Sequence, residues 1–494
     1  MTRIARFFMP RIEYILFAAI LWGIASTGPI LLNSDGDLPR HLLVGKIIRE
    51  SGVSLTDIFS YRTVGFPSFP HEWLSQVLLS SIYDLLGLGG VVLLTALTVT
   101  LTWVIIYYAA IRKSESLFVS VVMTGLGVGA SLIHILPRPH LFTFLFIALW
   151  IIALEQIEAG KTQRWWQLPV LMLVWVNLHG MFILGIAIWL IYIAGSFFEN
   201  SPKGWLKTNR TIALLSGGTF SIFATFLSPS GLKIWGTIIS LGGNAYITSH
   251  IPEYQSANFH MPETWPFILL LLLLIASFSR STQKVSFTDI FMVSAFAALA
   301  LYSSRMLPIF AVVSAPIAAQ KVSNWLKQDF SGSRFFIIEK NINTINGSSG
   351  GLIWLLVAFL TIGFLFRSNI PIDAGNKGNI FDPKFFPVDA VTWLEDHPQT
   401  GHMFNEFDWG GYILLKLWPQ YQIFMDGHTH IYGEALTREY EQVITLEDSW
   451  QDIFAKYNIQ WSIVRSDSRL ANALAEKGWT TLYKDNTAII LHAP

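Results

Sequence analysis

The sequence predicts an α-helical polytopic membrane protein of about eleven transmembrane helices, followed by a C-terminal extracytoplasmic α/β domain. Three observations predict this class. Of the 494 residues, 52% are hydrophobic, and the mean hydropathy is +0.47. Only 13% are charged, about half the roughly 25% of ordinary soluble domains. Residues 370–494 instead alternate short strand-like and helix-like runs, as a small soluble domain does.

The predicted spans are apolar runs that could cross a bilayer. They lie near residues 12–33, 88–111, 115–134, 140–157, 166–179, 181–198, 211–228, 265–279, 287–303, 306–320 and 351–368. Several are shorter than the ~20 residues that a perpendicular helix needs. The positions of these runs make residues 1–369 the membrane domain, with long outer loops at 34–73 and 228–265.

Lys and Arg residues favour one set of alternate loops, which predicts the orientation in the cell membrane. The N-terminal end carries Arg3, Arg6 and Arg11, and together with the loops on its side it holds about sixteen basic residues, against about seven in the loops on the other side. The positive-inside rule therefore places the N-terminus in the cytoplasm. With eleven spans, the domain 370–494 lies on the extracytoplasmic side of the inner or plasma membrane.

The C-terminal domain is large enough to form its own core. Its apolar runs YQIFMDG, QWSIVRS, TTLYKD and AIILHA predict strands, and DAVTWLEDH, ALTREYEQVI, WQDIFAKY and LANALAEKG predict helices.

Composition excludes several classes of function. The formal net charge is zero and the pI about 7.2, so nothing indicates nucleic-acid binding. With no cysteine in the chain, disulfides, thiolate metal sites and cysteine nucleophiles are absent. The sequence contains no nucleotide-binding fingerprint, which argues against a cytosolic nucleotide as cosubstrate.

The outer loops concentrate carboxylates, histidines and amides, whereas the cytoplasmic loops hold mostly Lys and Arg. Ionisable groups at membrane depth are costly and usually mark pathways or sites. We therefore take this one-sided set as candidates for substrate binding: Arg40, His41, Asp57, His71, Glu72, Arg138, His140, Asn177, His179, Glu253, His260 and Arg305.

The segment NSDGDLPRH places two carboxylates at the mouth of the first span. A partly desolvated Asp35 or Asp37 would make a good general base toward an alcohol or amide. Arg138 and Arg305 supply positive charge suited to a phosphate leaving group. Such a set suits sugar transfer from a lipid phosphate. Alternatively, Ser34 or Asp35 caps the helix that follows.

The sequence leaves the cofactor undetermined. Asp35, Asp37 and Glu72 could form an oxygen-rich site for Mg²⁺ or Mn²⁺, but spacing alone cannot bring separate segments together. In DGHTHIYG, Asp426, His428 and His430 have strand-end spacing but form an incomplete metal site.

Several motifs carry a family resemblance. They are GDxxxH (36–41), TDxFS (56–60), HEWLS (71–75), RPH (138–140), NLHG (177–180), and FNEFDWGGY followed by FMDGHTHIYG. Together they resemble GT-C-fold membrane glycosyltransferases, more narrowly the bacterial dolichyl-phosphate-mannose-type and oligosaccharyltransferase-like membrane proteins. The resemblance covers nearly the whole chain. It implies that one acidic residue of the first loop acts as base or orients the acceptor, with Asp37 the first choice and Asp35 the second.

Oligosaccharyltransferases hold an acceptor peptide with a Trp-Asp-Tyr-Gly motif in their outer domain. Asp408, Trp409 and Tyr412 are similar in composition and location, and are therefore candidates for acceptor binding. Their order departs from the motif, so sequon recognition is not implied. In the alternative reading, Trp409 and Tyr412 belong to the core and the adjacent glycines make a tight turn.

Three functional hypotheses remain at this stage. The first is a glycosyltransferase whose partners are a lipid-linked sugar donor, membrane lipids and an extracytoplasmic acceptor, which is a protein, a lipid or a glycan. The second is a transporter or flippase of lipid-linked glycan, which predicts charges near span centres and internal repeats. The third is a non-catalytic GT-C-derived scaffold that binds partners through its outer domain.

Overall fold

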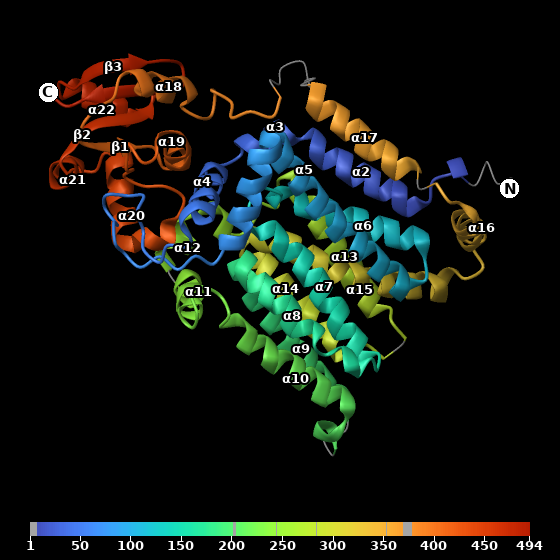
Figure 1. Cartoon of the computed structure of the whole chain (residues 1–494). Helices are drawn as coiled ribbons and strands as arrows, with labels where there is room; N and C mark the ends of the chain where they lie inside the picture. Colours follow the sequence, from blue (N-terminus) through green and yellow to red (C-terminus); the bar gives the residue numbers. More distant parts are fainter. Residues whose placement is uncertain (1–6, 201–203, 244, 283, 352, 369–377) are drawn as a thin grey trace.

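The computed structural model describes residues 7–200, 204–243, 245–282, 284–351, 353–368 and 378–494. Arg3, Arg6 and the predicted domain boundary between residues 369 and 370 lie outside them. Figure 1 shows a body of packed helices with the C-terminal domain, in red and orange, at one end.

Helices cover every predicted span. They are α2 (Ile12–Ser26), α3 (Gly28–Asn33), α5 (Trp73–Ser114), α6 (Leu117–Ser131), α7 (His140–Glu158), α8 (Gln167–Leu178), α9 (Ile183–Glu199), α10 (Asn209–Thr225), α13 (Trp265–Ser279), α14 (Phe287–Tyr302), α15 (Leu307–Phe330) and α17 (Ile353–Ser368). The helices outside the predicted spans are α4 (Asp37–Ser51), α11 (Lys233–Gly243), α12 (Ala245–His250) and α16 (Arg334–Ser348).

The helix lengths divide these spans into two groups. Within the described residues, six helical stretches are long and apolar enough to cross a bilayer, or seven if the bent pair α16 and α17 counts as one. Others are too short to cross alone, such as α8 with 12 residues and α2 with 15. The chain is thus a multi-pass membrane protein, and the number eleven stays a prediction.

Two local features explain how the body packs. Gly87 has φ 64° and separates an outer part of α5 from the membrane part, where the sequence predicted a span from residue 88. The buried helix α15 packs against α5, α6, α7, α13 and α14. Its small residues, Ala311, Ala315 and Ala318 among them, allow these neighbours to approach closely.

The C-terminal domain is built on a four-stranded sheet in the order β1-β2-β4-β3. Strand β1 pairs parallel with β2, and the other pairings are antiparallel. The elements are α18 (Val388–Asp396), β1 (His402–Asn405), α19 (Gly410–Leu417), α20 (Thr429–Thr445), α21 (Trp450–Lys456), β2 (Ile459–Arg465), α22 (Arg469–Glu476), β3 (Thr480–Lys484) and β4 (Ala488–His492). The four predicted helices and three of the predicted strands are confirmed.

One predicted strand is wrong and one was missed. YQIFMDG forms no ladder: its Ile423 makes a single bridge with Ser60 of the first outer loop. The sheet is instead completed by β1, whose first residue, His402, is exposed. Only four residues long, β1 gives too short an alternation to be recognised in the sequence.

The two faces of the sheet pack differently. One face, with Phe404, Val464 and Leu491, packs under α20, α21 and α22. The other, with Trp461 and Ile490, joins a cluster that includes apolar side chains of α4 and of α5. The C-terminal domain, from here on called the outer domain after the side of the membrane predicted for it, therefore shares a core with the first outer loop, which fixes its position on the helical body.

Candidate active site

One arginine joins the two carboxylates of the NSDGDLPRH segment. Arg138, just before α7, places its Nε 3.0 Å from Asp35 Oδ2 and its Nη1 3.1 Å from Asp37 Oδ2. Asp35 also accepts a hydrogen bond from the backbone N–H of Asp37, at 2.8 Å. Asp35 thus performs the capping role as well as the ion pair, although Gly36 occupies the N-cap position itself. Asp37 is the more exposed carboxylate, at 28% against 13%.

A third carboxylate links the two arginines predicted to contact phosphate. Glu253 Oε1 lies 3.8 Å from Arg138 Nη1 and 3.7 Å from Arg305 Nη1. Arg305 Nη1 also donates to the Tyr254 hydroxyl at 2.8 Å. Burial lowers the pKa of the Arg138 guanidinium, but Asp37, Asp35 and Glu253 outweigh this effect and raise the pKa. Arg138 therefore stays charged.

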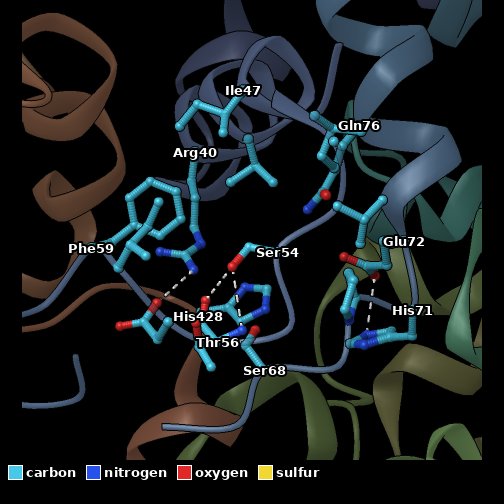
Figure 2. A pocket seen from close by; sticks show the side chains of 17 residues that line it. Arg40, Ile47, Ser54, Thr56, Phe59, Ser68, His71, Glu72, Gln76 and His428 are labelled. Atoms are coloured by element: carbon cyan, nitrogen blue, oxygen red, sulfur yellow. Dashed lines mark hydrogen bonds and ion pairs between the residues drawn. The ribbon is translucent and has the colours of Figure 1, made fainter. Parts of the chain in front are cut away.

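A separate carboxylate, Glu72, lies among histidines. Its oxygens are 3.4 Å from His179 Nε2, 3.7 Å from His71 Nε2 and 4.0 Å from His41 Nδ1. Figure 2 shows His71 and Glu72 side by side, with His428 of the outer domain across the pocket. Burial raises the pKa of Glu72, but these histidines and Arg305 outweigh it, and the pKa is lowered. The carboxylate is therefore ionised.

Two cavities meet at these groups. The first, the histidine cavity, has a volume of about 300 Å³ and is lined by six imidazoles: those of His41, His71, His140, His179, His428 and His430. The second, the acidic cavity, has a volume of about 510 Å³ and carries five carboxylates: those of Asp35, Asp37, Glu253, Asp408 and Glu441. Asp37, Arg138 and Glu253 line both cavities, so they form the wall between them.

The outer domain completes both cavities. Gly427 and Thr429 line each of them, and His428 and His430 line the histidine cavity. The sequence marked these histidines only as part of an incomplete metal site. Their place beside Asp37 depends on the docking of the outer domain, which no local pattern encodes. Glu441 and Tyr246, which also line the acidic cavity, were missed because they occupy ordinary helical positions.

Arg40 has a different partner from the one expected. It lines the histidine cavity, but its guanidinium forms an ion pair with Asp426 and lies 3.8 Å from Asp57. It is 5% exposed and lies over the Phe59 ring, as Figure 2 shows. A charge neutralised in this way anchors the outer domain to α4, and Arg40 is a weak candidate for contact with substrate.

Three other predicted substrate contacts lie outside both cavities. Asp57 accepts hydrogen bonds from Thr63 Oγ1 and the Ser60 backbone, which stabilise the first outer loop. Asn177 accepts the Trp73 indole N–H at 2.7 Å. The side chain of His260 is exposed. For these residues contact with substrate stays a prediction, because a position on one side of the membrane does not distinguish a cavity wall from a loop contact.

Of the three acceptor candidates in the outer domain, two lie in the core and one lines a cavity. Trp409 is 0% and Tyr412 is 3% exposed, and both belong to the core shared with α4. The alternative prediction, that both belong to the core, is confirmed, and their burial leaves little surface for contact with an acceptor. Asp408 lines the acidic cavity. The adjacent Gly410 and Gly411 form no turn but begin α19, where a side chain would collide with Met425 or Gly36.

The candidate metal ligands do not converge on one position. Asp35 and Asp37 both face the Arg138 guanidinium, while Glu72 is surrounded by imidazoles. Within the part of the chain that the structure describes, no group of three or more His, Asp or Glu side chains is arranged to hold a metal ion. The set Asp35, Asp37 and Glu72 thus does not fit a single Mg²⁺ or Mn²⁺ site.

Comparison with solved structures identifies the fold. No family model and no curated protein matches the sequence. The oligosaccharyltransferase AglB of Archaeoglobus fulgidus, in complex with an inhibitory peptide and a dolichol-phosphate, is similar with a TM-score of 0.60 and 12% identity over 97% of this chain and 74% of that one. The same enzyme tethered to an acceptor peptide with the NVT sequon gives a TM-score of 0.59 and 14% identity, over 92% and 69%. The chain therefore has the GT-C fold of membrane glycosyltransferases.

Proposed function

We propose that this protein is an integral-membrane glycosyltransferase that moves a sugar or glycan from a polyprenyl-phosphate-type lipid donor to an extracytoplasmic acceptor. Asp37 is the base in this proposal. The observation that carries it is the position of Asp37 on the wall between the histidine cavity and the acidic cavity. A base at the junction of two cavities can contact groups from both, as a transfer between two substrates requires.

The charges indicate which substrate enters which cavity. The histidine cavity is lined by three arginines: Arg40 pairs with Asp426, Arg138 pairs with Asp37, and Arg305 Nη1 donates to the Tyr254 hydroxyl. The histidine cavity also has an apolar side, formed by Met181, Ile183 and Leu184. This combination suits a lipid phosphate with its chain between helices. The acidic cavity then takes the acceptor.

The reaction follows from this placement. An acceptor hydroxyl or amide attacks C1 of the donor sugar, and the bond from C1 to the phosphate oxygen breaks. The acceptor proton moves to the Asp37 carboxylate, and the lipid phosphate leaves with the electron pair. Arg138 and Arg305 stabilise the charge on the leaving phosphate. Asp35 holds Arg138 in place from its other side, at 3.0 Å.

The remaining partners and the orientation belong to the same proposal. The donor is lipid-linked, and the acceptor is a protein, a lipid or a glycan. The N-terminus is cytoplasmic and the outer domain faces outward, so both substrates meet outside the cytoplasm. A dependence on Mg²⁺ or Mn²⁺ is tested by adding EDTA and then restoring each ion while donor loss is measured.

A donor-consumption assay tests the function. The purified protein is incubated with a panel of polyprenyl-phosphate and polyprenyl-pyrophosphate sugars and with cell extract as the source of acceptor, and donor loss is followed by mass spectrometry. We expect one donor class to be consumed. Tight donor binding without any consumption, across the whole panel, would favour the transporter or the scaffold instead.

A further inference from the structure

The acidic cavity has an uneven charge. Among its described lining residues, five carboxylates face a single arginine, Arg138. Arg138 pairs with Asp35 and Asp37, and Glu253 lies 3.8 Å from Arg138 and 3.7 Å from Arg305, so two positive charges are shared among three negative ones. Two more carboxylates, Asp408 and Glu441, come from the outer domain. The cavity therefore has a negative potential where it meets the reacting groups.

The carboxylates on opposite walls influence each other. Burial raises the pKa of Asp408, and the negative charges of Asp37 and Asp35 raise it further, while Arg465 lowers it. Arg465 is 3.1 Å from Asp408 Oδ2 and is not among the residues that line the cavity. The first outer loop and the outer domain thus contribute like charges to one cavity, and this arrangement is costly to the extent that cations do not balance it.

A buried imidazole nitrogen of the acidic cavity also lacks a hydrogen-bond partner. His134 lines the acidic cavity and is 7% exposed, and its Nε2 has no hydrogen-bond partner among the described residues. It lies 3.5 Å from Glu253 Oε2. An imidazole nitrogen beside carboxylate oxygens can accept hydrogen bonds from an ammonium group, which has three N–H donors.

The aromatic wall of the cavity already attracts one cation of the chain itself. Tyr246 lines the cavity, and the Arg438 guanidinium lies 3.9 Å from the centre of its ring. Phe407 and Tyr440 are further aromatic lining residues, with ring centroids 6.0 Å apart. Aromatic faces next to carboxylates favour a cation over a neutral or anionic group.

We propose that the acidic cavity selects an acceptor that carries a cationic ammonium group, and that it rejects anionic acceptors. This inference rests on the proposed function and names the acceptor chemistry for it. The ammonium group lies between the carboxylates of the outer domain and those of the first loop. Its source is an amino sugar or a lysine side chain.

Equilibrium binding to the full-length protein in lipid nanodiscs tests the inference without any turnover. The probes are methyl glucosaminide with its N-acetyl form, an N-acetyl-lysine amide with its ε-acetylated form, and methyl glucuronide as the anion. Glu441→Gln removes one charge while keeping the side-chain size. Asp452→Asn, at an exposed carboxylate on α21, is the matched control.

At least one of the two amines should bind about tenfold more tightly than its own acetylated form, and methyl glucuronide should bind most weakly of all the probes. The preferred amine identifies the source. Glu441→Gln should reduce the amine preference several-fold, whereas Asp452→Asn should leave it unchanged. Equal binding of amine and acetylated forms, strong glucuronide binding or an unaffected Glu441→Gln variant would overturn the inference. Binding of undecaprenyl phosphate, measured on the same samples, separates this result from a failure of the proposed function.

Discussion

Gly427 of the outer domain packs directly against the carboxylate of Asp37, so that a methyl group at Gly427 would overlap Asp37 Oδ1. The base of the proposed reaction is therefore positioned from two sides. Arg138 of the membrane domain pairs with one oxygen, and the DGH segment of the outer domain limits the space around the other.

Gly427→Ala should displace the Asp37 side chain and reduce the rate of transfer by about 100-fold, as small misplacements of catalytic groups do. Donor consumption per folded protein measures the effect. Gly332→Ala is the matched control, because nothing lies within 4 Å of a methyl group there. A Gly427→Ala variant with the wild-type rate would show that the contact does not position Asp37.

The ion pair between Arg40 and Asp426 should hold the outer domain on α4. Asp426→Asn leaves Arg40 buried with only Asp57 nearby, at 3.8 Å, and we expect a loss of about 3–5 kcal/mol in the free energy of unfolding. Chemical denaturation followed by tryptophan fluorescence measures it. In the exposed pair of Arg438 and Glu434, Glu434→Gln should cost less than about 0.5 kcal/mol. Similar costs for the two variants would contradict the anchoring role.

Stability should fall as the pH decreases from 7.5 to 5.5. Burial lowers the pKa of His428 and His430, so these imidazoles stay neutral in the folded protein. In the unfolded chain they take up protons near pH 6.5, which favours unfolding by up to about 1.4 kcal/mol per pH unit for each residue.

The change in melting temperature between the two pH values measures this effect. Replacing His428 and His430 by Asn should make the change smaller. His260→Asn, at an exposed side chain, should not alter it. An unchanged pH dependence in the double variant would contradict the buried, neutral state of these histidines.

Trp409 should contribute to the stability of the fold and not to the binding of the acceptor. Its indole N–H donates to the Phe385 carbonyl at 2.8 Å, and the side chain is 0% exposed. Trp409→Phe leaves this carbonyl without its partner and should cost about 1–3 kcal/mol of the free energy of unfolding. Donor consumption per folded molecule should not change. A selective rise in acceptor KM would instead restore the role in acceptor binding that the sequence suggested.

Local patterns were enough for most of the fold. Every predicted apolar span is helical, and the start of the span at residue 88 agrees with the break at Gly87. In the C-terminal domain the amphipathic helices were correct, whereas YQIFMDG was wrong as a strand. Its Ile423 instead forms a bridge with Ser60 of the first outer loop, a contact 363 residues away in sequence that periodicity cannot reveal.

The site was less predictable, because it is made by tertiary contacts. Charge placement selected Asp37, Arg138 and Glu253, which the structure brings together between the two cavities, since polar groups at a membrane boundary are costly and usually mark sites. The same criterion also selected Asn177 and His260, which lie outside both cavities. The pairing of Asp35 and Asp37 with Arg138 spans about 100 residues, and no spacing rule encodes such a contact.

The most direct test of the account is donor consumption by Asp37→Asn, compared with wild type at equal amounts of folded protein and with donor binding measured in parallel. Loss of the base should reduce the rate by about 10²- to 10⁴-fold, while donor affinity stays within a few-fold because Arg138 and Arg305 remain. An Asp37→Asn protein that consumes donor at the wild-type rate would contradict the central claim that this carboxylate, on the wall between the two cavities, is the base of the transfer.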